Sequence, residues 1–127
     1  MRITGFREIA TEFIRCEKYI QDALDLGDTH NAEDIFMGIL KKEYELWTAD
    51  NSAIVTQVIH FPRKIVLHLF LAGGNLKELE KLYREIEQWA HFQGISKITL
   101  DGRPGWERSF LRGYNFKTKV CNLTKNL

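Results

Sequence analysis

The feature that most constrains this chain is an apolar run followed at once by two glycines and an amphipathic segment. The run covers 64–71 and is apolar on both faces, which is typical of a central strand in a sheet that is covered on both sides. Residues 76–92 place apolar side chains three and four positions apart and stop before Gly94, which predicts a helix with a C-terminal glycine. A β-rich run at 95–100 follows, so this order predicts two parallel strands joined by a right-handed crossover.

The residues before this unit predict two helices. Apolar side chains from Phe6 to Leu24 follow helical spacing, and Gly27 closes the pattern. Asn31, with Asp34 three residues later, predicts the N-cap of a second, shorter helix.

Strands are predicted on both sides of the central unit. A hairpin of strands at 46–48 and 53–59 precedes it, and a two-turn helix at 106–112 and a last strand at 116–123 follow it. The predicted order is ααβββαβαβ. This is an α/β (α+β) fold with a mixed, mostly antiparallel central sheet and helices on both faces.

Length and charge limit the class of protein. A chain of 127 residues predicts one domain, 1–127, and 18 Lys+Arg against 17 Asp+Glu leave a net charge of +1, which favours neither nucleic acid nor membrane as a partner. The central apolar run is far shorter than the ~20 residues of a membrane helix. The N-terminus lacks the pattern of a secretory signal, so a cytoplasmic location is expected. Cys16 and Cys121 are predicted to be small buried hydrophobes, and no residue spacing predicts a metal site.

The element order, with Gly94, Gly102-Arg103, Gly105-Trp106 and Gly113-Tyr114, resembles the GNAT N-acetyltransferase-like fold. The local sequence from Gly94 to Tyr114 looks like a small branch of that superfamily commonly encoded by bacteriophages. The resemblance implies acetyl-CoA or another acyl-CoA as the donor.

The resemblance also implies where that donor would bind. The third predicted strand, at Leu71, would offer backbone groups to the pantetheine arm, and Gly73, Gly74 and Asn75 would hold the pyrophosphate at a helix N-terminus. The family's usual loop is longer, and this chain has no cationic residue there before Lys77, so the motif is degenerate. The alternative for the two glycines is a tight strand-to-helix turn that needs positive φ and holds no ligand.

Two residues are candidates for proton transfer. If Pro62-Arg63 is a two-residue turn, Gln57 lies opposite His68 in the sheet, and His68 is either a general base beside an acceptor pocket that includes Gln57 or a core histidine whose nitrogens Gln57 and a neighbour satisfy. The family's late tyrosine, which acts as general acid, falls on Ser109 here. Tyr114 is the other candidate acid, or an aromatic residue packed behind a helix end.

Two further site candidates lie after the 95–100 strand, where open sheets bind ligands. Arg103 could pair with a phosphate or carboxylate, or could stay bound within its own loop. Trp106 could line the substrate pocket or anchor a short helix in the core.

Two functions are therefore expected from the sequence. The first is a GNAT-like acyl-CoA-dependent N-acyltransferase with a degenerate cofactor motif that acts on an unknown amine. The second is a non-catalytic phage protein with this fold that works through a protein partner in structure, assembly or host interaction, in the host cytoplasm or the virion. Exposed sheet edges make a homodimer plausible in either case.

Overall fold

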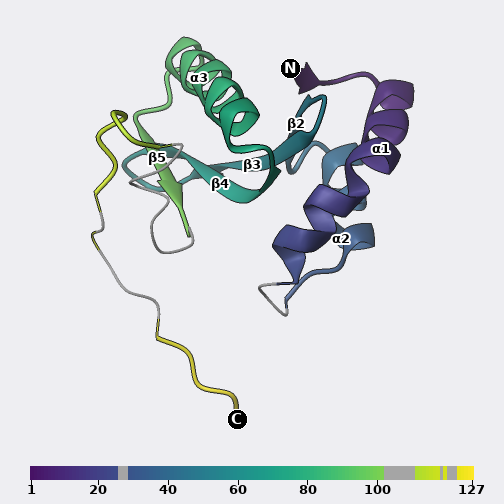
Figure 1. Cartoon of the computed structure of the whole chain (residues 1–127). Coiled ribbons are helices and arrows are strands. Elements are labelled where there is room, and N and C mark those ends of the chain that lie inside the picture. The colour runs from purple at the N-terminus through teal and green to yellow at the C-terminus, as the bar shows by residue number, and fades with distance from the viewer. Residues whose placement is uncertain (26–28, 102–110, 118, 120–122) are drawn as a thin grey trace.

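The structure is a computed structural model that describes residues 1–25, 29–101, 111–117, 119 and 123–127. Its elements follow the order β1 (Arg2–Ile3), α1 (Phe6–Leu24), α2 (Ala32–Leu40), β2 (Glu45–Ala49), β3 (Ser52–His60), β4 (Ile65–Gly74), α3 (Leu76–Phe92) and β5 (Lys97–Leu100) (Figure 1). The strands form one sheet in the order β1-β2-β3-β4-β5. Each neighbouring pair among the first four strands is antiparallel and β5 runs parallel to β4, so the predicted mixed, mostly antiparallel sheet is confirmed.

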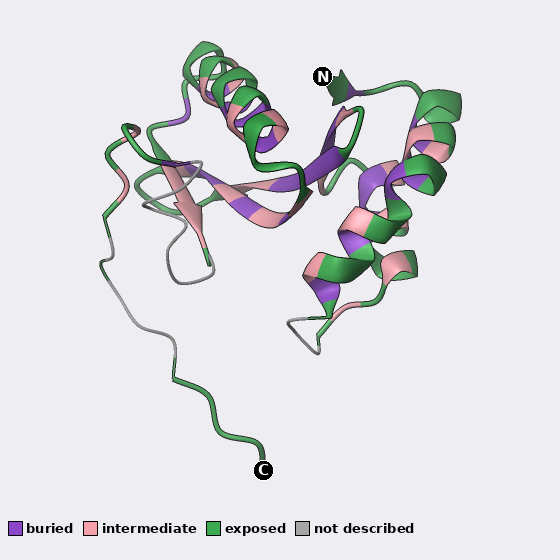
Figure 2. Cartoon of the chain, viewed as in Figure 1, coloured by how far each residue is buried: buried purple, intermediate pink, exposed green. Residues whose placement is uncertain are grey.

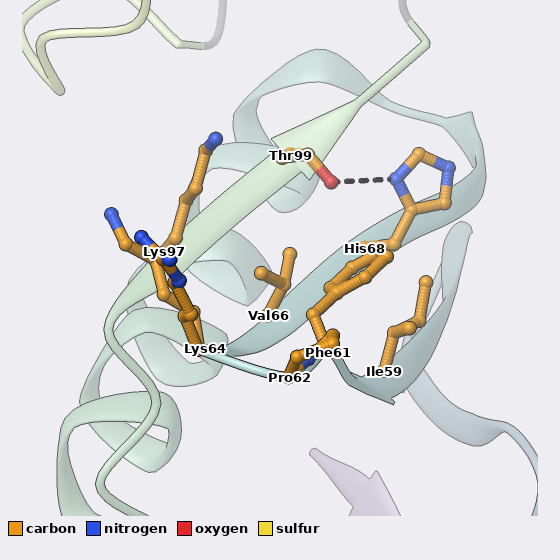
Figure 3. A pocket seen from close by; sticks show the side chains of 9 residues that line it. Ile59, Phe61, Pro62, Lys64, Val66, His68, Lys97 and Thr99 are labelled. Carbon is orange, nitrogen blue, oxygen red and sulfur yellow. Dashed lines mark hydrogen bonds between the residues drawn. The ribbon is translucent and has the colours of Figure 1, made fainter.

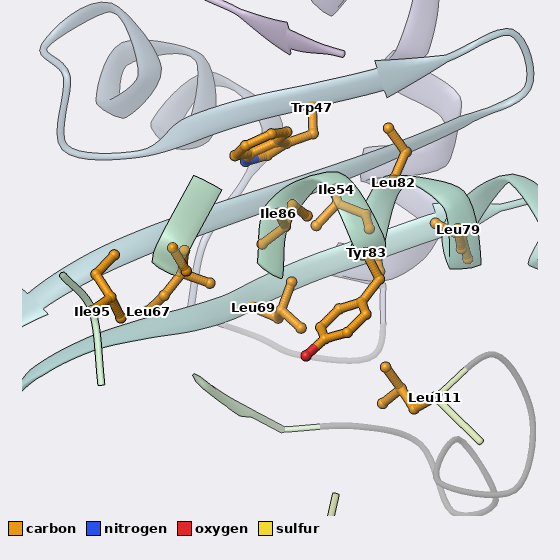
Figure 4. Close-up of a cluster of buried hydrophobic side chains, with 12 residues drawn as sticks. Trp47, Ile54, Leu67, Leu69, Leu79, Leu82, Tyr83, Ile86, Ile95 and Leu111 are labelled. Atoms are coloured by element: carbon orange, nitrogen blue, oxygen red, sulfur yellow. The ribbon is translucent and has the colours of Figure 1, made fainter. Parts of the chain in front are cut away.

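The sheet has a hydrophobic cluster on each face, with helices over both (Figure 2). On one face, α3 packs over a cluster that includes Trp47, Leu67 and Ile86 (Figure 4). On the other face, α1 and α2 pack over Leu46 and Val55. Alternation along the strands supplies both clusters, since successive side chains point to opposite faces. The expected helices on both faces are confirmed.

The helix predictions hold at their starts. Asn31 caps α2, because its side chain accepts from the Asp34 amide at 2.9 Å while the Asp34 carboxylate accepts from the Asn31 amide at 2.9 Å. Helix α3 begins after Asn75 and ends before Gly94, whose φ of 75° suits glycine. Gly27 lies outside the described residues.

The hairpin register is also as predicted. Gln57 pairs with His68 across β3 and β4, and the Phe61 amide donates to the Lys64 carbonyl at 2.9 Å over the Pro62-Arg63 turn. Cys16 is fully buried, as expected of a small hydrophobe, and burial raises the pKa of its thiol. Cys121 lies outside the described residues.

Three differences from the sequence prediction concern strand limits. The two-residue β1, which pairs with Trp47 and Leu46, is too short to leave a periodic pattern. Gly73 and Gly74 were expected in a turn but belong to β4, because β3 starts at Ser52 and pairs with Gly74. Strand β5 begins at Lys97 rather than 95.

The C-terminal predictions fall largely beyond the described residues. Of the predicted helix at 106–112, only residues 111 and 112 are described, and they form a turn. Of the predicted strand at 116–123, residues 116, 117, 119 and 123 are described, and none is in a strand.

Candidate functional site

The sheet is irregular in the middle of β4. Val55 pairs with Leu71 and the next residue, Thr56, pairs with Leu69, so Phe70 is an extra residue on β4. Such a bulge bends the strand and changes which face its side chains reach. Phe70 and Leu71 accordingly both pack against the cluster under α1 and α2.

The sheet also divides at this bulge. Pairing between β4 and β5 ends at Leu69 and Leu100, while β4 continues to Gly74. Within the described part of the chain, the β4 backbone from Phe70 onward has no strand partner on its β5 side. An unpaired strand edge presents N–H and C=O groups that an extended ligand can bind. Leu71, predicted to contact a donor, lies on this free edge.

His68 stands two residues before the bulge. Its Nδ1 lies 2.8 Å from Thr99 Oγ1 and its Nε2 lies 3.6 Å from Asp101 Oδ2, with 18% of the side chain exposed. The sequence suggested Gln57 and a neighbour as hydrogen-bond partners, and the structure shows Thr99 on β5 as such a neighbour. The contact between His68 and Thr99 was not predictable from the β3–β4 hairpin alone, because the β4–β5 register places Thr99 beside His68.

A pocket of about 660 Å³ opens beside His68 (Figure 3). It lies at the end of the β3–β4 hairpin and beside β5, on the sheet face that α1 and α2 cover farther along the strands. Its apolar lining residues are Ile59, Phe61, Pro62 and Val66. The cationic ones are Arg63, Lys64 and Lys97, and the remaining polar ones are His68 and Thr99. Its volume suits a small molecule. Gln57 is paired with His68 on the same face but is not among the lining residues.

Sequence analysis missed His30 as a neighbour of this site. The His30 ring meets the Phe70 ring edge to face at a centroid distance of 5.0 Å, and the His68 ring meets Phe70 at 6.4 Å. Two histidines from distant parts of the chain therefore flank the bulge residue. No local pattern identifies His30, because only packing of the segment before α2 against β4 brings it there.

Both glycines of β4 lie where a Cβ would collide with backbone atoms of another segment. A Cβ on Gly73 would lie 2.4 Å from the Tyr19 carbonyl oxygen of α1, so glycine permits close approach of helix and sheet. Gly74 has φ of 118°, and a Cβ there would lie 2.2 Å from the Asn51 carbonyl oxygen. Both observations favour the alternative in which the two glycines allow backbone segments to lie close together and hold no ligand.

The start of α3 is occupied by the protein's own groups. Asn75 Oδ1 accepts from the amides of Lys77 at 3.0 Å and Glu78 at 3.2 Å, and the Asn75 amide donates to the Asn51 carbonyl at 3.1 Å. Two of the amides that could bind a phosphate at this helix N-terminus are therefore already bonded within the protein.

A carboxylate near the start of α3 is also unfavourable for binding a phosphate there. Glu78 Oε1 accepts from the Asn51 amide at 2.7 Å and from Ser52 Oγ at 2.9 Å. The Asn51 hydrogen bond holds the pKa of the Glu78 carboxyl below its usual range, so the group is negative at neutral pH. The pyrophosphate of acyl-CoA therefore does not fit the start of α3.

Tyr114, predicted as a candidate acid, does not line this pocket. Tyr114 packs edge to face on Tyr83 of α3 at a centroid distance of 4.8 Å, on the opposite side of the sheet from His68. Arg103, Trp106 and Ser109 lie outside the described residues. Among the residues that are described, no group of three or more His, Cys, Asp or Glu is arranged to hold a metal ion. No described helix is long and apolar enough to cross a membrane.

Comparison with known proteins identifies the fold. No protein-family model and no curated protein matches the sequence. Among solved structures, an aminoglycoside acetyltransferase from an uncultured soil metagenomic sample, solved with trehalose and with sisomicin, aligns with a TM-score of 0.73 at 10% identity over 100% of this chain and 94% of that one. A GNAT family acetyltransferase of Staphylococcus aureus aligns with a TM-score of 0.63 at 14% identity over 100% and 98%. A possible acetyltransferase from Clostridium difficile aligns with a TM-score of 0.64 at 10% identity over 97% and 93%. The chain therefore has the GNAT-like fold.

Proposed function

We propose that this chain transfers an acyl group from a thioester donor to an amine bound in the pocket beside His68. The observation that carries the proposal is the position of His68, on the pocket wall and two residues before the point where β4 bulges and parts from β5. A donor on the free strand edge and an acceptor in the pocket would meet at this point. Acetyl-CoA or another acyl-CoA is the first donor to test.

The donor would lie along β4 beyond Leu69. Backbone groups from Phe70 to Ala72 can hydrogen-bond the amides of a pantetheine arm as an added strand would. Such a donor supplies an activated carbonyl carbon with a thiolate leaving group. Its nucleotide end receives no contribution from the start of α3, for the reasons given above.

His68 would act as general base toward the amine. When Nδ1–H donates to Thr99 Oγ1, Nε2 keeps its lone pair and can accept the proton that the amine loses as it forms the new C–N bond. Thr99 thus holds the ring orientation. The Asp101 carboxylate, 3.6 Å from Nε2, attracts the positive charge that the ring gains.

A non-catalytic role through protein contacts, the other function expected from the sequence, has less support. The fold neighbours with a stated activity are acetyltransferases. A pocket of small-molecule size beside a histidine also favours binding of a small acceptor over a flat protein interface.

The test is an acyl-transfer assay that follows release of the free thiol. Acetyl-CoA and S-acetylpantetheine serve as donors with a panel of small amines. His68→Gln should lower kcat by about 10²–10⁴-fold, the usual contribution of a general base. His60→Gln is the matched control, because His60 is an exposed histidine at the last position of β3 and is not among the residues that line the pocket. Absence of turnover by the wild type with any amine, or equal rates for wild type and His68→Gln, would contradict the proposal.

A further inference from the structure

The pocket beside His68 concentrates positive charge. Arg63, Lys64 and Lys97 line it and are exposed, and none of the described residues that line it carries a carboxylate. Among described residues, none of these three cations forms an ion pair. The whole chain carries a net charge of only +1, so the pocket is far more basic than the protein average. A concave site lined by charges of one sign attracts ligands of the other sign.

The charges are separated from His68 by an apolar stretch. Lys64, Val66 and His68 follow one another at two-residue intervals along one face of the β4 segment, so Lys64 and His68 lie about 13 Å apart along the strand. Lys97 of β5 pairs with Val66 of β4 and lies on the same face of the sheet. Figure 3 shows the two lysines at one end of the pocket, the imidazole at the other, and Val66 and Phe61 between them.

The middle of the pocket is suited to an apolar group. Ile59, Val66 and Phe61 line it, and Phe61 remains 53% exposed although its large ring is apolar. Burying such a surface against an apolar ligand is favourable by roughly 25 cal/mol for each Å² removed from water.

We propose that the acceptor is a small amine that carries a carboxylate at the far end of an apolar spacer. This inference rests on the proposed function and names its substrate class. The amine would lie at His68, the spacer over Val66 and Phe61, and the carboxylate between Lys64 and Lys97. A polycationic amine, such as an aminoglycoside, is disfavoured because its additional ammonium groups would face like charges.

Binding without any donor tests this charge preference directly. Octanoate and octylamine form a matched pair with the same apolar chain and opposite charges, and their affinities are measured by calorimetric titration. Each lysine contributes about 1 kcal/mol in water at contact distance, so octanoate should bind at least about tenfold tighter at low ionic strength. The preference should shrink in high salt, since exposed charges are screened.

Charge reversal identifies the groups responsible. The double variant Lys64→Glu/Lys97→Glu should reverse the preference to octylamine. Lys41→Glu is the matched control, because this exposed lysine at the end of α2 lies outside the pocket. Thermal unfolding of each variant checks that the fold is retained. Equal or tighter binding of octylamine by the wild type, or a preference unchanged by the double reversal, would overturn the inference.

The acyl-transfer assay separates this inference from the proposed function. With an active donor, 8-aminooctanoate should be acylated with a higher kcat/KM than octylamine or 1,8-diaminooctane. If the protein binds octanoate more tightly than octylamine but acylates no amine, the pocket does prefer carboxylates and the acyltransferase function is rejected. If 1,8-diaminooctane is the better acceptor, the acyltransferase function stands and the preference for a carboxylate-bearing acceptor is rejected. If a second copy of the chain covers the pocket, octanoate will neither bind nor change the oligomeric state, and the inference fails.

Discussion

Replacing Gly73 with alanine separates a packing role from a ligand-binding role for this glycine. The added Cβ would lie 2.4 Å from the Tyr19 carbonyl oxygen, while ordinary contact begins at 3.4 Å. Helix α1 must therefore move away from β4 by about 1 Å, because the oxygen belongs to the backbone and cannot rotate aside. Crowding of this kind costs about 1–3 kcal/mol.

Thermal and urea unfolding measure this cost. For a chain of this length, each kcal/mol corresponds to roughly 3–5 °C, so Gly73→Ala should lower Tm by about 3–15 °C. Gly94→Ala is the control, since no atom lies within 4 Å of its Cβ and only the positive φ is unfavourable, at about 1 kcal/mol. If Gly73→Ala unfolds within about 0.5 kcal/mol of the wild type, or keeps its stability and loses only donor binding, the packing explanation is wrong.

Three further predictions follow from the polar contacts of the fold. Coenzyme A and pantetheine should bind with affinities within about threefold of each other by calorimetry, because the amides at the start of α3 are already bonded; an advantage of more than about tenfold for coenzyme A would refute this. Thr56→Val should destabilise the protein by about 1–3 kcal/mol in urea unfolding, because Trp47 Nε1 loses its acceptor at 3.0 Å and Glu45 loses its donor, whereas Thr56→Ser should cost much less. Burial raises the pKa of Glu45 above 4.5, so its contribution to stability is full below that pH and is lost as pH rises through the higher folded value. The Tm of Glu45→Gln relative to the wild type should therefore increase from pH 4 to pH 7, and a difference that does not change with pH would count against this.

Local sequence patterns predicted most of the elements and one detail of the site. The Asn31 cap, the α3 limits and the parallel β4–β5 pair all follow from spacing and capping residues, which act within a few positions of the chain. The pairing of Gln57 with His68 follows from the length of one turn, because antiparallel register is set by the loop that joins the strands.

The irregular features were not predictable in this way. The extra residue at Phe70 leaves no mark in composition, since both the bulged residue and its neighbour are apolar. The role of Gly73 depends on the Tyr19 carbonyl of a helix far away in sequence. His30 and Thr99 reach the site only because separate segments pack against β4.

The sequence by itself therefore determined the order of the elements from α1 to β5, the position of β4 inside the sheet, and the pairing of Gln57 with His68 across the hairpin. Those properties depend on periodicity, caps and turn length. The tertiary structure alone decided that β4 bulges and separates from β5 beside His68, that the start of α3 is closed by Asn75 and Glu78, and that cations gather around one apolar pocket. Apart from the local Asn75 cap, these features require groups from separate segments to meet, and such neighbours are set by the packing of whole elements rather than by the local sequence.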